Sequence, residues 1–313
     1  MHIVTGAAGF IGSNLVRGLN ARGVRDILAV DDLERGDKFL NLRDCEVTDF
    51  MDKREFREAV RRGAPGLDKV KAVLHQGACA DTTESDGHYM MENNFTYSKE
   101  LLHWTVDRQI PFVYASSAAV YGACKQCSET PACEQPLNVY AYSKLLFDSY
   151  VLPRLPAARS TIVGLRYFNV YGPREQHKGK MASMVFQLYD QLTRTGVARL
   201  FEGTDGYADG EQRRDFIYVG DVIDVNLFFA ERGAQQGIFN VGTGQSRSFN
   251  DIARTLISQL GRGAIEYIPF PDSLRGKYQS FTESDISKLR ASGYTRPFTS
   301  LEEGIRKLCE LAG

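Results

Sequence analysis

The sequence predicts an α/β protein built on a doubly wound parallel sheet, with a smaller C-terminal lobe. Six short apolar strands alternate with helical patterns as far as residue 170. A turn with three glycines joins the first strand to the first helix, and the regular alternation breaks after residue 170. We therefore expect one domain over residues 1–170, with returning segments near 214–245, and a lobe formed mainly by residues 171–313.

Composition excludes several classes of protein. The 313 residues include 38 Lys and Arg against 39 Asp and Glu, which argues against a nucleic-acid-binding surface over the whole chain. No apolar run reaches the ~18 residues of a membrane span. The N-terminus enters a strand directly and lacks the basic start and apolar stretch of a secretory signal, so we expect a cytoplasmic protein.

The glycine turn follows the first strand, His2–Thr5, and reads G-x-x-G-x-x-G through Gly6, Gly9 and Gly12. Glycines let a backbone approach a pyrophosphate, and the next helix offers amides and a favourable dipole. The spacing differs by one residue from the common dinucleotide motif, and a simple tight turn is the alternative. We favour the dinucleotide site of a Rossmann domain.

The second strand, Asp26–Val30, ends at Asp31 and Asp32. An acid at this point holds the adenosine ribose diol of NAD. Arg35 and Lys38 follow, and cations there would instead hold the 2′-phosphate of NADP. Asp31 argues for NAD and Lys38 for NADP, so the residues alone leave the cofactor open. Lys38 as a solvated loop residue is a further alternative.

The next two strands carry weaker signals. The segment Val47–Asp49 places an acid at a third strand end, where it contacts adenine or caps the following helix. Val70–Ala78 is expected to form the fourth strand, with His75 packed at its end rather than acting as a base. Asn93 and Asn94 are expected to open a helix, either facing the cofactor or capping.

The fifth strand ends in two serines, and about 23 residues later Tyr140 and Lys144 lie one helical turn apart. A phenol has a pKa near ~10, and an ammonium one turn away favours the phenolate. Tyr140 would then exchange a proton with a substrate hydroxyl that one of the two serines shares. The alternatives are an ordinary helix pair and a strand-end cap.

The six cysteines are expected to be reduced thiols, and no metal site is expected. Cys124, Cys127 and Cys133 are close in sequence, but no fourth Cys or His stands at zinc-finger spacing.

Several segments together carry a family resemblance: the glycine turn, Ala115–Ala118, Tyr140 with Lys144, and Arg166–Pro173. They resemble the extended short-chain dehydrogenase/reductases, in the branch that modifies nucleotide sugars. A closer resemblance, to the nucleotide-heptose 6-epimerases, rests on Ala80–Glu84, Tyr89–Asn94, Lys99–His103, Pro173–Glu175, His177–Gly179, Met181–Ser183 and Ile265–Pro271.

The closer resemblance implies a bound NADP, an ADP-heptose substrate that is epimerised at C6, and a place in heptose supply for lipopolysaccharide core. It also implies a homo-oligomer, with a pentamer suggested. The cofactor contacts that it implies, together with the glycines, are Gly6, Gly9, Phe10, Ile11, Gly12, Asp31, Asp32, Lys38, Lys53, Gln76, Gly77, Ala78, Cys79, Ala80, Asn93, Lys144, Val170 and Lys178.

The substrate contacts that the resemblance implies are Asn169, Lys180, Gln187, Phe201, Glu202, Gly203, Thr204, Arg214 and Tyr278. Lys180 and Gln187 depart from the family pattern, where a serine and a histidine are usual. We expect Arg214 to pair with the substrate diphosphate, where a planar fork is useful. An ion pair with Asp215 or Glu211 is the alternative.

Inversion of a secondary alcohol needs oxidation, because its carbinol hydrogen is not acidic. Removing a hydride gives a ketone, and returning it to the other face inverts the centre. Tyr140, supported by Lys144 and Ser117, is expected to serve one hydroxyl orientation. The resemblance makes Lys178 the base for the other, where the residues alone favour a phosphate-binding or solvated lysine.

Three other functions compete with this one. A UDP-hexose 4-epimerase would use the same Tyr140 and Lys144. Dehydratases of the family usually carry an Asp-Glu pair where Ala118 and Ala119 stand, so elimination is disfavoured. A non-catalytic NADP-binding regulator would be expected to have lost the tyrosine–lysine pair, and both residues are present.

Overall fold

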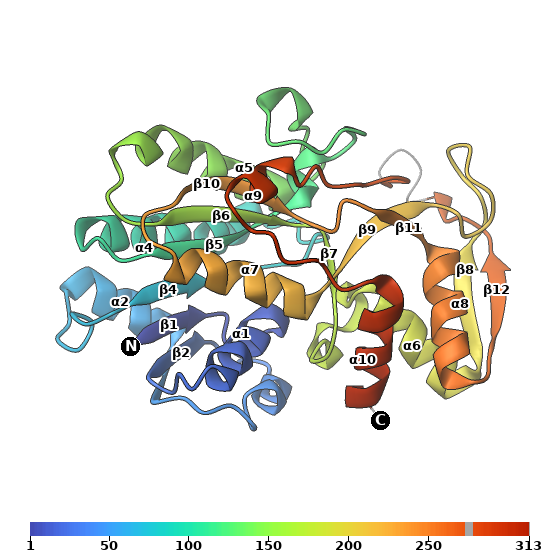
Figure 1. The fold of residues 1–313 in the computed structure, drawn as a ribbon, viewed down its shortest axis with the longest axis horizontal. Helices are drawn as coiled ribbons and strands as arrows, with labels where there is room; N and C mark the ends of the chain where they lie inside the picture. The colour runs from blue at the N-terminus through green and yellow to red at the C-terminus, as the bar shows by residue number, and fades with distance from the viewer. Residues whose placement is uncertain (273–277, 313) are drawn as a thin grey trace.

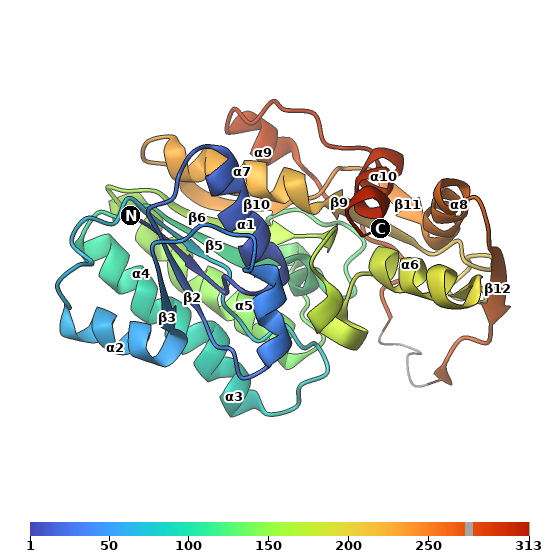
Figure 2. The ribbon, with the colours of Figure 1, turned by 90° about the horizontal axis from the view of Figure 1, so that it is seen from below.

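The computed structural model describes residues 1–272 and 278–312. A parallel sheet of seven strands lies at its centre, in the order β10-β6-β5-β4-β1-β2-β3, with helices on both faces (Figures 1 and 2). This confirms the predicted doubly wound sheet. The strands are β1 His2–Thr5, β2 Ile27–Asp31, β3 Asp49–Asp52, β4 Ala72–His75, β5 Phe112–Ser117, β6 Ile162–Tyr167 and β10 Gln236–Val241.

Different helices bury the two faces of the sheet. One face packs against α1 (Phe10–Ala21) and α7 (Val219–Glu231), and the other against α2 (Lys53–Arg62), α4 (Tyr97–Asp107) and α5 (Val139–Val151). Successive strand residues point to opposite faces, so the strands supply alternate side chains to two separate apolar clusters. Both faces are therefore closed, and the carboxyl ends of the strands remain available for a ligand.

The seventh strand comes from beyond residue 170. β10 pairs with β6 along its whole length, and α7, just before it, packs against α1. Leu289 and Tyr294, later still, belong to the apolar cluster on the same face. The division into residues 1–170 and 171–313, with returning segments near 214–245, stays a prediction. These contacts show that the return continues beyond residue 245.

The predicted helix start at Asn93 and Asn94 is wrong. The helix starts six residues earlier as α3 (Gly87–Met91), where Asp86 caps it by accepting the Tyr89 N–H at 3.0 Å. It continues through one π-helical turn, Glu92–Thr96, into α4. Such turns often occur at functional sites. The two asparagines therefore lie inside a helix, at its irregular turn.

The predicted end of the third strand at Asp49 is also wrong. β3 begins at Asp49 and ends at Asp52. Asp52, which sits at the carboxyl end, accepts the Arg54 N–H at 2.8 Å and caps α2. Asp49 is exposed and bonds only locally, to the Phe50 N–H. The acid at this strand end is thus a helix cap.

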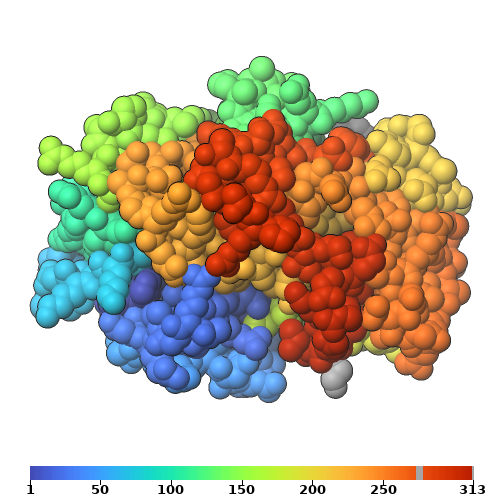
Figure 3. Space-filling model, viewed as in Figure 1, coloured from blue at the N-terminus to red at the C-terminus, as the bar shows by residue number. Residues whose placement is uncertain are grey.

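The lobe contains two small sheets, β11-β9-β7 and β12-β8, packed with three helices around a third apolar cluster. In Figure 3 the last part of the chain, coloured red, crosses this face between the sheet domain and the lobe. The remaining elements are β7 Asn169–Tyr171, β8 Val197–Phe201, β9 Arg213–Tyr218, β11 Ser246–Ser248, β12 Ala264–Ile268, α6 Met184–Thr195, α8 Phe249–Leu260, α9 Ser287–Ala291 and α10 Leu301–Ala312.

Two strands of the lobe arise directly at the carboxyl edge of the main sheet. β7 follows β6 after one residue, and β9 runs directly into α7. The two pair in parallel, with Asn169 opposite Phe216. In the part of the chain that the structure describes, no helix is both long and apolar enough to cross a membrane.

Candidate active site

The glycine turn is built by close backbone contacts. Gly6 has a φ of +66°, and a Cβ there would lie 2.7 Å from the Gly77 nitrogen. A Cβ on Gly12 would lie 2.0 Å from the Gly6 carbonyl oxygen. α1 begins after Gly9 without a side-chain cap and without an acid in its first turn. Its first N–H groups therefore point into open space, which suits an anion.

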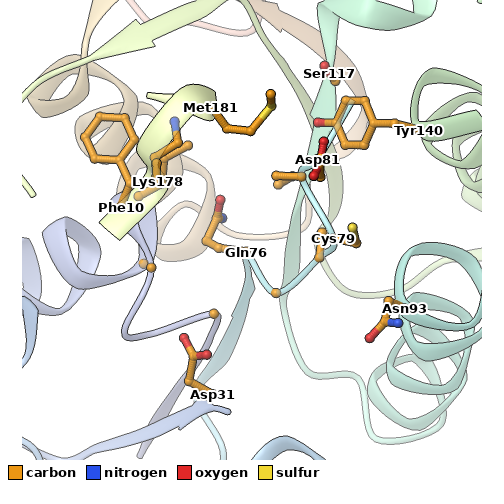
Figure 4. Close-up of a pocket in the computed structure, with 18 of the residues that line it drawn as sticks. Phe10, Asp31, Gln76, Cys79, Asp81, Asn93, Ser117, Tyr140, Lys178 and Met181 are labelled. Carbon is orange, nitrogen blue, oxygen red and sulfur yellow. The ribbon is translucent and has the colours of Figure 1, made fainter. Parts of the chain in front are cut away.

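A cavity of about 580 Å³ opens in front of this turn, across the carboxyl ends of the strands. Every residue that the sequence predicted for the cofactor lines it, and so do Ser117 and Tyr140. Figure 4 shows part of this lining, with Asp31 at one end of the view and Tyr140 at the other. The structure thus brings the predicted cofactor and catalytic residues around one space.

The far end of the cavity carries paired charges. Asp31 accepts the Ala8 and Asp32 N–H groups, each at 2.7 Å, and it also pairs with Lys38. Asp32 forms an ion pair with Lys53 at 2.6 Å. Burial raises the pKa of Asp32, but its two lysine neighbours outweigh this, so the net shift is downward. Lys38 also donates to the Asp32 carbonyl at 2.8 Å.

The catalytic pair is held against the end of β5. Lys144 is 6% exposed, and its Nζ donates to the Ala115 carbonyl at 2.9 Å. Burial lowers the pKa of Lys144 to about 8, against an opposing effect of Asp148. Burial raises the pKa of Tyr140, and a hydrogen bond with Ser117 lowers it.

One electrostatic expectation needs correction. Sequence reasoning expected Lys144 to lower the Tyr140 pKa, whereas burial leaves that pKa raised, and the group that opposes the rise is Ser117. The reason is that the Lys144 ammonium is directed to a backbone carbonyl of β5. Lys144 is nonetheless buried, and it lines the same cavity as Tyr140.

Lys178 stands on the opposite wall. It lies in a 3-10 turn, Gln176–Met181, and its Nζ is 5.0 Å from the centre of the Phe10 ring. The Glu175 carboxylate, fully buried, accepts from Lys178 at 3.3 Å and from the Ser183 N–H at 2.6 Å. Figure 4 shows Lys178 and Phe10 on one side, and Tyr140 with Ser117 on the other.

Arg214 is a buried guanidinium that pairs with no carboxylate among the described residues. Its hydrogen bond goes to the neighbouring Arg213 carbonyl at 3.0 Å, and it stacks 4.9 Å from the centre of the Tyr278 ring. Asp215 binds the Thr243 N–H at 2.8 Å, and Glu211 accepts from Asn250 at 2.6 Å. Burial lowers the pKa of Arg214. The alternative ion pair with Asp215 or Glu211 therefore does not form, and the expected pairing with a diphosphate stays a prediction.

The other predicted substrate residues are distributed around the lobe, and none is among the residues lining the 580 Å³ cavity. Phe201 packs with Tyr278 at 6.4 Å between ring centres. Asn169 and Lys180 are exposed. Gln187 donates to the Ala182 carbonyl at 2.7 Å and the Lys180 carbonyl at 3.3 Å, so it ties α6 to the turn that carries Lys178.

The remaining members of the substrate set form the loop after β8. Glu202 extends the pairing with β12 by donating its N–H to the Ile268 carbonyl at 2.8 Å. At Gly203 a Cβ would lie 2.3 Å from the Tyr207 carbonyl oxygen, so the loop folds tightly back on itself. Thr204 accepts the Tyr207 N–H through its carbonyl at 3.0 Å and closes this turn.

Comparison with known proteins identifies the family. Residues 2–242 match the family described as the NAD dependent epimerase/dehydratase family. The chain belongs to this family. It is 55% identical over 306 residues to an ADP-L-glycero-D-manno-heptose-6-epimerase from Alkalilimnicola ehrlichii, covering 98% of this chain and 95% of that protein.

Solved structures of epimerases have the same fold. The ADP-L-glycero-D-manno-heptose-6-epimerase of Helicobacter pylori matches with a TM-score of 0.83 and 32% identity, over 99% of this chain and 95% of that one. UDP-glucose 4-epimerase from Thermotoga maritima matches with a TM-score of 0.82 and 29% identity, over 99% and 98%. The resemblance to nucleotide-sugar epimerases that the sequence carries is confirmed.

The residues present fit the nicotinamide dinucleotide that this epimerase/dehydratase family uses. Uncapped amides at the start of α1 suit a diphosphate. Acids and lysines at the end of β2 suit a ribose or its phosphate. Tyr140 and Lys144 lie at the other end of the same cavity, where a nicotinamide ring would meet a substrate.

Sequence reasoning did not name His177 as a site residue and left the role of Asn94 open. His177 lines the cavity and lies 3.1 Å from the Asn41 amide, and burial lowers its pKa to about 4. Its position beside Lys178 was the available signal. Asn94 binds both the N–H and the carbonyl of Cys79, at 2.8 and 2.9 Å. Only the π-helical turn turns Asn94 inward, and the sequence pattern did not predict that turn.

Two further predictions concern His75 and the cysteines. His75 is buried and bonds to Thr5 at 2.6 Å and Ser98 at 2.9 Å, which confirms it as a packed strand-end residue. All six cysteines are free thiols. The described residues contain no group of three His, Cys, Asp or Glu side chains arranged to hold a metal ion.

Proposed function

We propose that the protein converts ADP-D-glycero-D-manno-heptose into ADP-L-glycero-D-manno-heptose by inverting C6 of the sugar. The observation that carries this proposal is the placement of Tyr140 and Lys178 on opposite walls of one dinucleotide-type cavity. The relative that is 55% identical names the substrate class. The product would supply heptose for lipopolysaccharide core.

Tyr140 acts on one epimer. When bound, the nicotinamide supplies the acceptor and the donor of hydride. Tyr140 takes the hydroxyl proton as the substrate is oxidised to a ketone, and Ser117 shares the same hydroxyl. Lys144, charged below its pKa of about 8, keeps a positive charge beside the tyrosine as the proton moves. These three residues are the proposed machinery for one hydroxyl orientation.

Lys178 acts on the other epimer. After the ketone has presented its second face, reduction forms an alkoxide whose oxygen points to the wall opposite Tyr140. Lys178 donates the proton to it, and the reverse reaction uses Lys178 as the base. Glu175 and Phe10 hold the ammonium on that wall. A two-sided arrangement is what an inversion requires and a simple oxidation does not.

Arg214 anchors the substrate in this proposal. A buried guanidinium that no carboxylate neutralises suits the diphosphate, which presents oxygens to both arms of the fork. Tyr278 stacks on the same guanidinium and Phe201 packs beside it. Asn169, Lys180, Gln187 and the Glu202–Thr204 turn complete the proposed substrate set. Of these, Gln187 acts through the turn that carries Lys178.

NADP is the proposed cofactor. Asp31 is occupied by two N–H groups and by Lys38, so its oxygens are less available to a ribose diol. Lys38, Lys53 and Arg35 all line the same end of the cavity and offer positive charge to a 2′-phosphate.

We also propose that the protein is a cytoplasmic homo-oligomer. Light scattering would measure the mass of the assembly, and a pentamer is the first state to test.

The substrate test uses purified protein with ADP-D-glycero-D-manno-heptose, and NMR to follow the configuration at C6. Conversion to a mixture of the two epimers without net change of cofactor absorbance supports the proposal. No conversion, together with turnover of UDP-galactose, would replace it with 4-epimerisation of a hexose. An absence of turnover with either, alongside tight NADP binding, would favour the non-catalytic regulator.

The cofactor test compares binding of NADP and NAD by calorimetry. Lys38→Ala should weaken NADP binding by about tenfold or more, because a charged hydrogen bond is lost, and change NAD binding little. Lys69→Ala, at an exposed loop position, is the matched control and should change neither. Equal losses for both cofactors would contradict a 2′-phosphate contact at Lys38.

A further inference from the structure

Helix α5, which carries Tyr140 and Lys144, is joined to the end of β5 at three points. Three successive residues of β5 each contact one of three α5 residues spaced by four. Ser117 contacts Tyr140, and the Ala115 carbonyl accepts from Lys144 at 2.9 Å. The Ser116 hydroxyl donates to the third helix residue, Asp148, at 2.8 Å. The first two helix residues are in the proposed mechanism, and the third is not.

Asp148 is fully buried, and donors surround its carboxylate. Besides Ser116, it accepts from the Tyr114 hydroxyl at 3.0 Å and from the Arg166 Nε at 2.9 Å. Burial raises the pKa of Asp148, and Arg166 opposes this as the nearest cation. An ion pair with two added hydroxyl donors is the arrangement in which a buried carboxylate stays charged.

Arg166 fixes this carboxylate to the rest of the fold. The guanidinium is 1% exposed and also donates to the Glu134 carboxylate at 2.6 Å and the Tyr121 hydroxyl at 3.2 Å. Tyr121 in turn donates to Asn240 on β10 at 2.5 Å. Asp148 is therefore held from β5, β6 and, through Tyr121, β10. Its position leaves α5 little freedom to slide along the sheet.

The charge of Asp148 also raises the pKa of Lys144, against the effect of burial. The other titratable groups around this lysine are His75 and Cys79 from the β4 side and Tyr140 on its own helix. Burial lowers the pKa of His75 to about 3 and raises that of Cys79, so both are neutral near pH 7. Tyr114, which faces Asp148, has a pKa raised by burial and is neutral too.

We propose that Asp148 is a positioning residue for the hydride-transfer site. Clamped by Arg166 and Ser116, it holds Tyr140 and Lys144 in register with β5 and keeps Lys144 charged. This inference rests on the proposed function for its catalytic consequence, but its physical content concerns only residues of this chain. The substitution that separates charge from shape is Asp148→Asn, because an amide keeps the acceptor for Ser116 and Arg166.

The test is an NMR titration of the lysine Cε signals, with Lys144 assigned by its disappearance in Lys144→Met. In Asp148→Asn the Lys144 signal should titrate about one pH unit lower than in the wild type. Turnover should then fall about fivefold at pH 8 and little at pH 6, with KM unchanged. A Lys144 titration equal to that of the wild type, or an equal loss of turnover at both pH values, overturns the proposal.

Glu134→Gln is the matched control, since it removes a carboxylate from Arg166 on the side away from Lys144. It should lower the melting temperature without moving the Lys144 titration. If Asp148→Asn does not fold, Ser116→Ala tests the positioning role with the charge retained. It should reduce kcat several-fold at every pH with KM unchanged, and an unchanged kcat overturns the proposal. The Lys144 titration tests the role of Asp148 even if the wild type does not turn over ADP-heptose.

Discussion

At the residue scale, the two proposed proton-transfer groups differ in how they are held. Tyr140 depends on the end of β5, where Ser117 bonds to it and the Ala115 carbonyl holds Lys144. Lys178 depends on one buried carboxylate, Glu175, which also binds the N–H and hydroxyl of Ser183, at 2.6 and 2.7 Å. Glu175 therefore pairs with the Lys178 charge and also holds Ser183, which follows the turn that carries Lys178.

Replacing Lys178 by Gln tests whether this lysine transfers a proton to the substrate or is only a solvated side chain. Epimerisation should fall by about 10²-fold or more, because a general acid–base group is removed. The measurement is the rate of C6 inversion by NMR, together with the melting temperature, which should change little. Lys69→Gln, at an exposed loop position outside the cavity, is the control and should keep the wild-type rate. Equal rates in the two variants would contradict Lys178 as the second base.

The pH dependence of turnover should show an alkaline limb near pH 8. Burial lowers the pKa of Lys144 to about 8, so the charge beside Tyr140 is present below that pH and is lost as the pH rises through it. The measurement is kcat between pH 6 and pH 10 at saturating substrate. A rate that stays constant to pH 10 would show that the Lys144 charge is not needed.

These residues show what sequence can and cannot give at this scale. The spacing of Tyr140 and Lys144 places both on one helix face, and the structure has them there. The sequence does not show which group shifts the pKa of Tyr140. The Lys144 ammonium is directed by the Ala115 carbonyl, which belongs to a strand about 30 residues earlier. The same holds for Arg214, whose two neighbouring acids are occupied by the lobe's own backbone and side chains.

At the element scale, the π-helical turn between α3 and α4 is the feature that sequence patterns did not predict. Helical periodicity continues through Gly87–Asp107, and a single extra residue in one turn leaves that pattern nearly intact. Its effect is local but large. Asn94 is turned to the sheet and holds Cys79, whereas Asn93 faces the cavity.

Substituting the two asparagines should therefore give different results. Asn94→Ala removes a buried amide that bonds to the N–H and the carbonyl of Cys79 and to the Ser143 hydroxyl, so we expect a loss of about 2–4 kcal/mol in the free energy of unfolding. Asn93→Ala removes an amide that bonds to the Tyr89 carbonyl one turn earlier, and it should cost about 0.5 kcal/mol or less. Denaturant unfolding measures both. Similar losses in the two variants would contradict the inward orientation of Asn94.

At the scale of the whole molecule, a buried histidine links stability to pH. Burial lowers the pKa of His75 to about 3, so the unfolded chain binds this proton first as the pH falls below 6.5. Stability is therefore fully present above pH 6.5 and declines as the pH falls toward 3. At pH 4.5 the loss from this one group should be about 2–3 kcal/mol.

The check is denaturant unfolding at pH 7 and pH 4.5 for the wild type and His75→Gln. The variant should be less sensitive to acid by the amount that His75 contributes, whatever its stability at pH 7. His103→Gln, on an exposed helix face, is the control and should keep the wild-type difference. An unchanged pH dependence in His75→Gln would show that other groups cause acid unfolding.

The first six strands and the glycine turn were easier to predict than the pairing of β10 that completes the sheet. Six strands and the glycine turn follow from local runs of apolar residues and from glycine spacing, and the structure has both. The partner of β10, strand β6, lies about 70 residues earlier, across the lobe. No local pattern specifies such a pairing, because it depends on how the lobe returns the chain.

The return of β10 to the sheet has a consequence for any attempt to shorten the protein. A fragment ending at residue 170 would lose β10 and leave the N–H and carbonyl groups on that edge of β6 without partners, while β5 still pairs with the other edge. It would also lose α7 and uncover the apolar side chains beneath that helix. An unprotected edge next to an uncovered apolar face invites pairing between molecules. Such a fragment should aggregate on expression, although its glycine turn and Tyr140 are both intact.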